Sequence, residues 1–216
     1  VYAPGSTSTD NTAHGYFAGS GSAIYADSAQ AMRNGGNGVT AQVGSNIDAS
    51  NGDANDNNAN GYQAGLGSAV NAFNTGASGN KQNGYALYNG ASMNAVLSES
   101  LSNTNNGYTA DLGSSMDAGV QFNTGNSTRA EGNGQNGYAS STGSAMNAVA
   151  ALSKDNGQNG FAAWQGGMLN ASYHGPSGKF AVADHNGGQG FGAWLNATLN
   201  ADAATAKNNG ADGFHI

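Results

Sequence analysis

The chain has 216 residues, of which 36 are glycine and only 9% are charged, and its formal net charge is -7 at pH 7. Ordinary globular domains carry roughly 25% charged residues. The six lysine and arginine residues are scattered, so no basic stripe is available for nucleic acid. Cysteine is absent, and no apolar run approaches the ~20 residues of a membrane helix, so we expect no membrane insertion. Because the chain begins at Val1, we expect a processed, secreted protein that acts outside the cell or on its surface.

Residues 1–14 show no obvious repeat and carry one charged side chain, that of Asp10. We expect this segment to form an N-terminal arm that is long enough to lie across a neighbouring molecule. Val1 and Tyr2 are the residues that we expect to make subunit contacts there.

Residues 15–212 are built from one repeated unit. A glycine opens each unit, and most of these glycines are 23 residues apart, with two intervals of 30. The repeat glycines are Gly15, Gly38, Gly61, Gly84, Gly107, Gly137, Gly160, Gly190 and Gly213. A fixed period of this size is typical of stacked repeats, in which each unit buries its apolar face against its neighbours.

Apolar residues alternate with small or polar residues inside each unit. Counting from the repeat glycine, position 2 is mostly aromatic, position 10 is aliphatic, and position 12 is alanine in all eight complete units. A period of two predicts β-strands. The expected core ladders are Tyr62, Tyr85, Tyr108 and Tyr138; Met93, Met116 and Met146; and Ala72, Ala95, Ala118 and Ala148. Residues of the opposite parity, such as Thr109, are expected to face outward.

Each unit closes with asparagine or a related residue before the next repeat glycine, as at Asn60-Gly61. Asn-Gly adopts positive φ readily, so these pairs are predicted to be turn corners. The two insertions follow the constant alanine, and we expect 122–126 and 174–178 to be turns of lengthened coils.

Two all-β architectures fit this pattern. An outer-membrane barrel would have short turns at one end, long loops at the other and a strongly apolar outer face. The intervals here are even and the apolar columns are largely alanine. We therefore predict a β-solenoid of eight 23-residue coils, two of them lengthened to 30 residues, with cross-β-like stacking.

Residues 213–216 repeat the opening of a unit and stop after its aromatic residue. We expect this truncated ninth repeat to leave an unpaired strand edge that another subunit completes. Phe214, His215 and Ile216 are the expected contacts.

The spacing of glycine and alanine in the units, as in Gly44 and Ala49 or Gly113 and Ala118, resembles the repeats of curlin-type subunits of bacterial functional amyloid. The asparagine of that pattern lies one residue later here, as at Asn147, and its glutamine survives only at Gln42. The resemblance implies a β-solenoid that polymerises end to end.

Motifs for chemistry are absent from the sequence. The G-x-G-x-x-G match at 132–137 leads into a strand, whereas a nucleotide-binding loop follows one. The histidines have no metal-ligand spacing, 53–57 lacks the glycine and glutamate of a calcium loop, and no serine is paired with histidine and carboxylate. We expect no catalytic activity and no cofactor. Three glycosylation sequons are present, so Asn126, Asn170 and Asn196 are candidate sites for a glycan.

The sequence thus predicts a self-assembling extracellular structural protein, such as the subunit of a filament, an amyloid-like fibre or a sheath in a biofilm matrix, whose main partner is itself. The alternative is a monomeric solenoid that binds carbohydrate or another surface. Trp164 and Trp194 both occupy position 5 of their units and would form its sugar-stacking platform.

Overall fold

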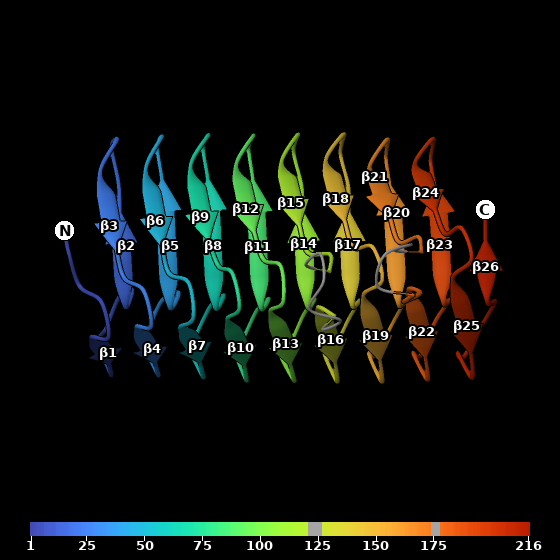
Figure 1. The fold of residues 1–216 in the computed structure, drawn as a ribbon, viewed down its shortest axis with the longest axis horizontal. Coiled ribbons are helices and arrows are strands. Elements are labelled where there is room, and N and C mark those ends of the chain that lie inside the picture. Colours follow the sequence, from blue (N-terminus) through green and yellow to red (C-terminus); the bar gives the residue numbers. More distant parts are fainter. Residues whose placement is uncertain (121–126, 174–177) are drawn as a thin grey trace.

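The computed structural model describes residues 1–120, 127–173 and 178–216, in which every regular element is a β-strand (Figure 1). The chain winds as a parallel β-solenoid, as the repeat period predicts, and it has about nine coils where eight were expected. Each coil contributes one strand to each of three sheets, except the last, which contributes to two. The coils follow one another along a single axis from the N-terminus to the C-terminus (Figure 1).

The three sheets are named here by their first strands. The β1 sheet contains β1 (Thr7–Thr9), β4 (Gln30–Met32), β7 (Asp53–Asn55), β10 (Gly76–Ser78), β13 (Glu99–Leu101), β16 (Arg129–Glu131), β19 (Leu152–Lys154), β22 (Val182–Asp184) and β25 (Thr205–Lys207). The β2 sheet contains β2 (Tyr16–Ala18), β5 (Val39–Gln42), β8 (Tyr62–Gly65), β11 (Tyr85–Tyr88), β14 (Tyr108–Ala110), β17 (Tyr138–Ser140), β20 (Phe161–Trp164), β23 (Phe191–Trp194) and β26 (Phe214–His215). The β3 sheet contains β3 (Ala23–Tyr25), β6 (Asn46–Asp48), β9 (Ala69–Asn71), β12 (Ser92–Asn94), β15 (Ser115–Asp117), β18 (Ala145–Asn147), β21 (Met168–Asn170) and β24 (Thr198–Asn200).

Strand register follows the sequence repeat. Tyr85 pairs with Tyr62 in the coil before it and with Tyr108 in the coil after it. The register is kept across the first insertion, where Met116 pairs with Met146. Residues 121–126 and 174–177, which contain most of both insertions, lie outside the described residues. Since every described pair joins equivalent positions, like residues stack on like along the axis.

The N-terminal segment belongs to the stack. Residues 1–14 are not the separate arm that we expect from the sequence, because Thr7–Thr9 form β1 and pair with β4, and Tyr2 forms a bridge with Tyr25. In this register Ala3 occupies the column of the constant alanine and Val1 the aliphatic column of Ile24. The repeat is not obvious in this segment because Val1 corresponds to position 10 of a unit, so the segment begins in the middle of a repeat. The last residues are also in the stack, since β26 pairs with β23.

The corners of the coil have left-handed backbone at positions that sequence analysis did not predict. Position 7 is a glycine with φ near +70° in most coils, for example Gly44 at 68° and Gly113 at 73°. Asn196, the exception, also has a positive φ of 60°. This corner explains the glycine column, because glycine adopts such φ values at little cost and asparagine tolerates them.

The repeat glycine has a different role from the one predicted. Asn60 and Gly61 precede β8 at a bend of the chain, but neither has a positive φ, so the expectation of left-handed backbone at these pairs is wrong. A Cβ at Gly61 would lie 2.8 Å from the carbonyl oxygen of Gly84 and 2.9 Å from the amide nitrogen of Asn80. The position is glycine because the next coil and a buried amide approach it too closely for any side chain.

The core is a thin layer of aromatic, aliphatic and alanine side chains between the three sheets. Tyr85, Ala118 and Ala148 are completely buried, and Met116 is 2% exposed. Thr109 was expected to face solvent but is only 9% exposed. The outer face of the β2 sheet is partly covered by its own side chains, since a Cβ at Gly192 would collide with the ring of Trp194. Parity alone therefore did not predict exposure on this sheet.

The alanine column limits the width of the coil. Ala118 is fully buried and pairs across the stack with other alanines, so Ala118→Leu should overpack the core and cost about 1–3 kcal/mol of unfolding free energy. Ser115 lies on the same coil and is exposed, so Ser115→Leu should be nearly neutral. Chemical denaturation of both variants checks this, and equal losses would contradict the assigned facing.

Candidate functional site

A buried column of asparagine amides runs the length of the solenoid. Each member lies four residues before a repeat glycine, and those inside the stack are at most 2% exposed. The column consists of Asn11, Asn34, Asn57, Asn80, Asn103, Asn133, Asn156, Asn186 and Asn209. We call it the inner amide ladder. Its members stack because the 23-residue register aligns them coil after coil.

The amides from Asn34 to Asn186 use both of their polar atoms. The Nδ2 of Asn80 donates to Oδ1 of Asn103 at 2.9 Å and to the carbonyl oxygen of Ala54 at 2.9 Å. Its Oδ1 accepts from the backbone N–H and from Nδ2 of Asn57, both at 3.0 Å. Buried amides are tolerated only when satisfied in this way. Every amide-to-amide bond of this ladder is donated toward the C-terminal end, so the ladder has a direction.

A second ladder runs in the opposite direction. Its members are the residues before the repeat glycines, and from Asn60 onward the Nδ2 of each donates to Oδ1 of the member in the preceding coil at 2.8–3.1 Å. They are Asn37, Asn60, Asn83, Asn106, Asn136 and Asn159. We call it the corner amide ladder. In the first coil, Nδ1 of His14 accepts from the backbone N–H of Asn37 at 3.0 Å, and burial lowers the pKa of His14.

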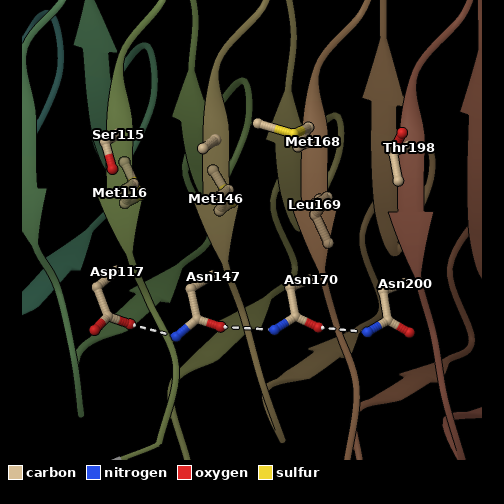
Figure 2. A pocket seen from close by; sticks show the side chains of 11 residues that line it. Ser115, Met116, Asp117, Met146, Asn147, Met168, Leu169, Asn170, Thr198 and Asn200 are labelled. Atoms are coloured by element: carbon tan, nitrogen blue, oxygen red, sulfur yellow. Dashed lines mark hydrogen bonds between the residues drawn. The ribbon is translucent and has the colours of Figure 1, made fainter.

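A third, solvent-facing row lies on the β3 sheet. Asn147 donates to Asp117 at 2.9 Å, Asn170 to Asn147 at 3.3 Å, and Asn200 to Asn170 at 3.2 Å (Figure 2). Beside this row is a shallow trough of about 390 Å³ that passes Ser115 and Met168. The trough is open and has no converging charged groups, so it has the form of a flat sheet surface.

Aromatic rings form a continuous stack inside the β2 sheet. From Tyr62 to Phe214 the ring centroids of successive coils are 4.7–5.1 Å apart and the planes differ by at most 8°. Val39 interrupts the column between Tyr16 and Tyr62. The Tyr108 hydroxyl donates to the carbonyl oxygen of Ser98 at 2.8 Å. Parallel offset rings in contact stabilise the stack beyond the area that they bury.

Within the described residues, the ladder members predicted from the sequence lie together inside the solenoid. The tyrosines of the predicted ladder and its alanines are fully buried, and Met93, Met116 and Met146 are 2–4% exposed. The inner amide ladder was missed. Its signal is visible in the sequence as an asparagine four residues before all nine repeat glycines, a constancy that matches the alanine column.

The two outermost coils expose the groups that the inner coils bury. At the first coil, Val1 is 84% exposed and Tyr2 stacks on Tyr25 at 5.2 Å. At the last coil, Phe214 is 55% exposed and fully exposed Ile216 lies beside it. A cavity of about 410 Å³ opens there, and it is lined by apolar side chains that include Phe191, Leu199, Ala201, Phe214 and Ile216.

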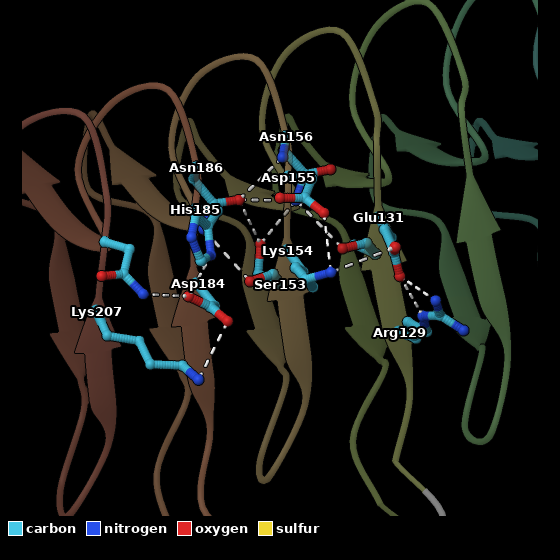
Figure 3. A network of polar contacts seen from close by, with 12 residues as sticks. Arg129, Glu131, Ser153, Lys154, Asp155, Asn156, Asp184, His185, Asn186 and Lys207 are labelled. Carbon is cyan, nitrogen blue, oxygen red and sulfur yellow. Dashed lines mark hydrogen bonds and ion pairs between the residues drawn. The ribbon is translucent and has the colours of Figure 1, made fainter.

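Charged side chains gather along the β1 sheet and its corner. Glu131 lies between Arg129 and Lys154, and Lys154 also pairs with Asp155 at 3.0 Å (Figure 3). Asp184 lies 3.2 Å from Lys207 and 2.7 Å from His185. Burial alone would raise the pKa of Asp184, but hydrogen bonds from Lys207 and Asn208 outweigh it, and the pKa is lowered. Positive and negative side chains therefore alternate along this part of the β1 sheet and its corner.

The predicted glycosylation sites have different surroundings. Asn126 lies outside the described residues. Asn170 is half-buried and engages Asn147 and Asn200 through its side chain, whereas Asn196 is exposed at a corner. Of the two described sequons, Asn196 is therefore the one whose amide has room for a glycan.

The two tryptophans stack on each other. The ring centroids of Trp164 and Trp194 are 5.4 Å apart with planes 16° apart, and His215 lies against Trp194 at 5.4 Å. The two tryptophans therefore cover one face of each other, and His215 lies against Trp194 as well. A sugar platform needs open ring faces, and the rings here use these faces to contact one another, which does not favour the carbohydrate-binding alternative.

Within 1–120, 127–173 and 178–216, no group of three or more histidine, aspartate or glutamate side chains could hold a metal ion. No helix that could cross a membrane was found in the same ranges. Comparison with protein-family models gave no match, and no curated protein is significantly similar to the chain.

The inner ladder should carry a large share of stability. Asn80→Ala would remove the acceptor of the Asn57 N–H, one of the two acceptors of Asn57 Nδ2 and the side-chain donor to the carbonyl oxygen of Ala54, so we expect a loss of about 3 kcal/mol or more. The control is Asn94→Ala, which breaks the same amide-to-amide bond on the exposed face and should cost below about 1 kcal/mol. Urea denaturation measures both, and similar losses would show that burial does not set the cost.

Stability should also fall in alkali. Burial raises the pKa of Tyr62, Tyr85, Tyr108 and Tyr138, although hydrogen bonds such as those from Thr75 and Ser98 oppose this at Tyr85. The native state therefore holds these protons where an unfolded chain, with tyrosine pKa near ~10, releases them. Their contribution is complete below about pH 10 and decreases as the pH rises further.

Denaturation midpoints at a series of pH values from about 8 to 12 test the alkaline effect. Tyr85→Phe removes one of these ionisable groups and should make the decline shallower. A pH-independent midpoint would contradict it.

Proposed function

We propose that this chain is a self-assembling structural protein, the subunit of an extracellular filament or sheath, and that it has no catalytic role. The observation that supports the proposal most is the identity of the contacts on the two sides of a coil. Each coil contacts the following coil through the same kinds of groups through which it contacts the preceding one. Backbone donors, amide ladders, rings and alanines all repeat at one register. The last coil of one copy is therefore complementary to the first coil of another.

Backbone geometry at the last coil supports this directly. The N–H of Phe191 donates to the carbonyl oxygen of Gly213 in the following coil at 2.9 Å, and Tyr16 does the same to Gly38 at 2.8 Å. The equivalent N–H of Phe214 is a donor on the face of the last coil. A strand edge of this kind is a template for pairing with another chain.

The likeness to curlin-type subunits supports an extracellular fibre only in part. Glycine and alanine keep the curlin spacing, and both patterns predict stacked coils. The buried amide ladder of this chain lies elsewhere in the repeat, four residues before the glycine. The same physical solution, amides in register through a solenoid, supports assembly without a shared ancestor.

Phe214→Pro tests end-to-end assembly. Proline removes the outward N–H and the stacking ring but no hydrogen bond that the preceding coil needs, so the variant should remain β-rich while filament growth falls at least about tenfold. Phe214→Tyr keeps both features and should assemble like the unaltered chain. Electron microscopy counts filaments, and aligned fibres should diffract near ~4.8 Å along their axis.

Two results would contradict the proposal. An unaltered protein that stays monomeric at every concentration would favour a binding module. Wild-type growth by Phe214→Pro would show that subunits associate side by side.

A further inference from the structure

We infer that two copies join head to tail in a single register, in which Lys207 of one copy pairs with Asp10 of the next. This joint rests on the proposed self-assembly and specifies its geometry. Three independent features of the end coils support it: the order of charges, the direction of the amide ladders and the shape of the apolar cavity.

The charges on the β1 sheet alternate in sign toward the C-terminal end. Glu131, Lys154, Asp184 and Lys207 occupy the third position of successive strands β16, β19, β22 and β25. Lys154 bridges back to Glu131 at 3.9 Å, and Lys207 bridges back to Asp184 at 3.2 Å. The column therefore ends in a positive charge, and its ammonium is more than half exposed, with 54% side-chain exposure.

The first coil offers the matching negative charge. Asp10 follows β1 directly, and its carboxylate binds Arg33 of the second coil at 2.9 Å while remaining 60% exposed. Inside the stack, Lys154 pairs with Asp155, the residue directly after its strand. A second copy stacked in register would place Thr9 on Lys207 and Asp10 on Asn208. The carboxylate of Asp10 would then lie in the column next to that of Lys207, as Asp155 lies next to Lys154. Across the joint, the charges of Asp184, Lys207, Asp10 and Arg33 would alternate over these two adjacent columns.

The inner amide ladder requires the same polarity. Asn209, in the last coil, accepts from Asn186 at 3.0 Å, and its Nδ2 donates to the carbonyl oxygen of Ala183 at 3.1 Å. In the inner coils the second N–H of this group donates to the amide of the following coil, as from Asn186 to Asn209. Asn11, in the first coil, donates to Asn34 at 2.9 Å, and its Oδ1 is the acceptor that the ladder would use next. Donor meets acceptor only when the last coil of one copy faces the first coil of another.

The corner ladder gives a complementary constraint. It donates toward the N-terminal end, so the first coil presents the backbone N–H of His14. Asp212 occupies the same column in the last coil, and its carboxylate accepts at this corner, where His215 also contacts it at 3.0 Å. Two first coils facing each other would set donors of this column against donors. The two ladders together therefore oppose head-to-head and tail-to-tail joints.

The apolar cavity identifies what fills the joint. It lies between β24 and β26, above Leu199 and Phe214. Inside the solenoid, the space above Leu169 and Phe161 holds Leu199 and Phe191 of the following coil. Val1 belongs to the column of Leu199 and Tyr16 to that of Phe214, as their pairing positions show. The occupant is therefore the first coil of a second copy, which brings these two side chains.

Charge reversal with rescue tests the joint. Asp10→Lys and Lys207→Glu should each slow filament elongation at least about fivefold, because each sets like charges against each other at the joint. An equal mixture of the two variants should elongate within about twofold of the unaltered chain, because opposite charges then meet at every mixed joint. Seeded elongation followed by light scattering gives the rates.

Interior reversals serve as matched controls. Asp56→Lys changes the column of Asp10 beside the same Arg33, and Lys154→Glu changes the column of Lys207, but both lie inside the stack. Each should elongate within about twofold of the unaltered chain. Circular dichroism checks the fold, and the neutral variants Asp10→Asn and Lys207→Gln provide smaller losses in the same direction if a reversed variant does not fold.

The outcomes separate the joint from the proposed function. If the unaltered chain forms filaments but the end variants elongate normally, or the mixture fails to recover, the head-to-tail register is overturned and self-assembly stands. If interior controls slow elongation as much as the end variants, the joint is also overturned. If the unaltered chain forms no filaments, the proposed function itself fails.

Discussion

Contact between identical positions one coil apart is the constraint on which this structure depends. The aromatic rings lie 4.7–5.1 Å apart and the inner amides bond at 2.9–3.0 Å, which are distances set by the spacing of parallel strands. A residue type that tolerates its own copy above and below is therefore required at each position. Tyrosine, asparagine and alanine meet this condition, which explains the biased composition.

The inner amide ladder adds to the specificity of the register. A displacement by one residue would turn the apolar side chains away from the core, and it would also bury the amides of Asn57 and Asn80 without their partners. The repeat glycine contributes to the same register, because Gly61 leaves room for the amide of Asn80. The rings and alanines therefore provide most of the burial, and the amides raise the cost of any other alignment.

The stacking of the coils could be predicted from the sequence, but the backbone of the corners and the structure of the N-terminal end could not. Period-two alternation and the 23-residue spacing predicted parallel stacking because they depend only on burial. The left-handed corners at positions such as Val43 and Leu66 could not be predicted, since β-branched and bulky residues rarely adopt positive φ. Thr109 is buried and not exposed as expected, because neighbouring side chains cover the outer face of its sheet. Such covering depends on tertiary contacts and does not follow the period of two in the sequence. The segment 1–14 was misassigned because it enters the repeat midway.

Folding within the chain and joining between chains use the same interactions in this molecule. An interior coil gains two neighbours, while the first and last coils each leave a ring, an amide and a strand edge without one. Joining two copies pairs a last coil with a first coil and leaves one first coil and one last coil at the far ends, so the driving force does not diminish with length. The apolar columns alone do not distinguish one end from the other. The direction of the amide ladders and the order of charges on the β1 sheet therefore determine the orientation of a joining copy.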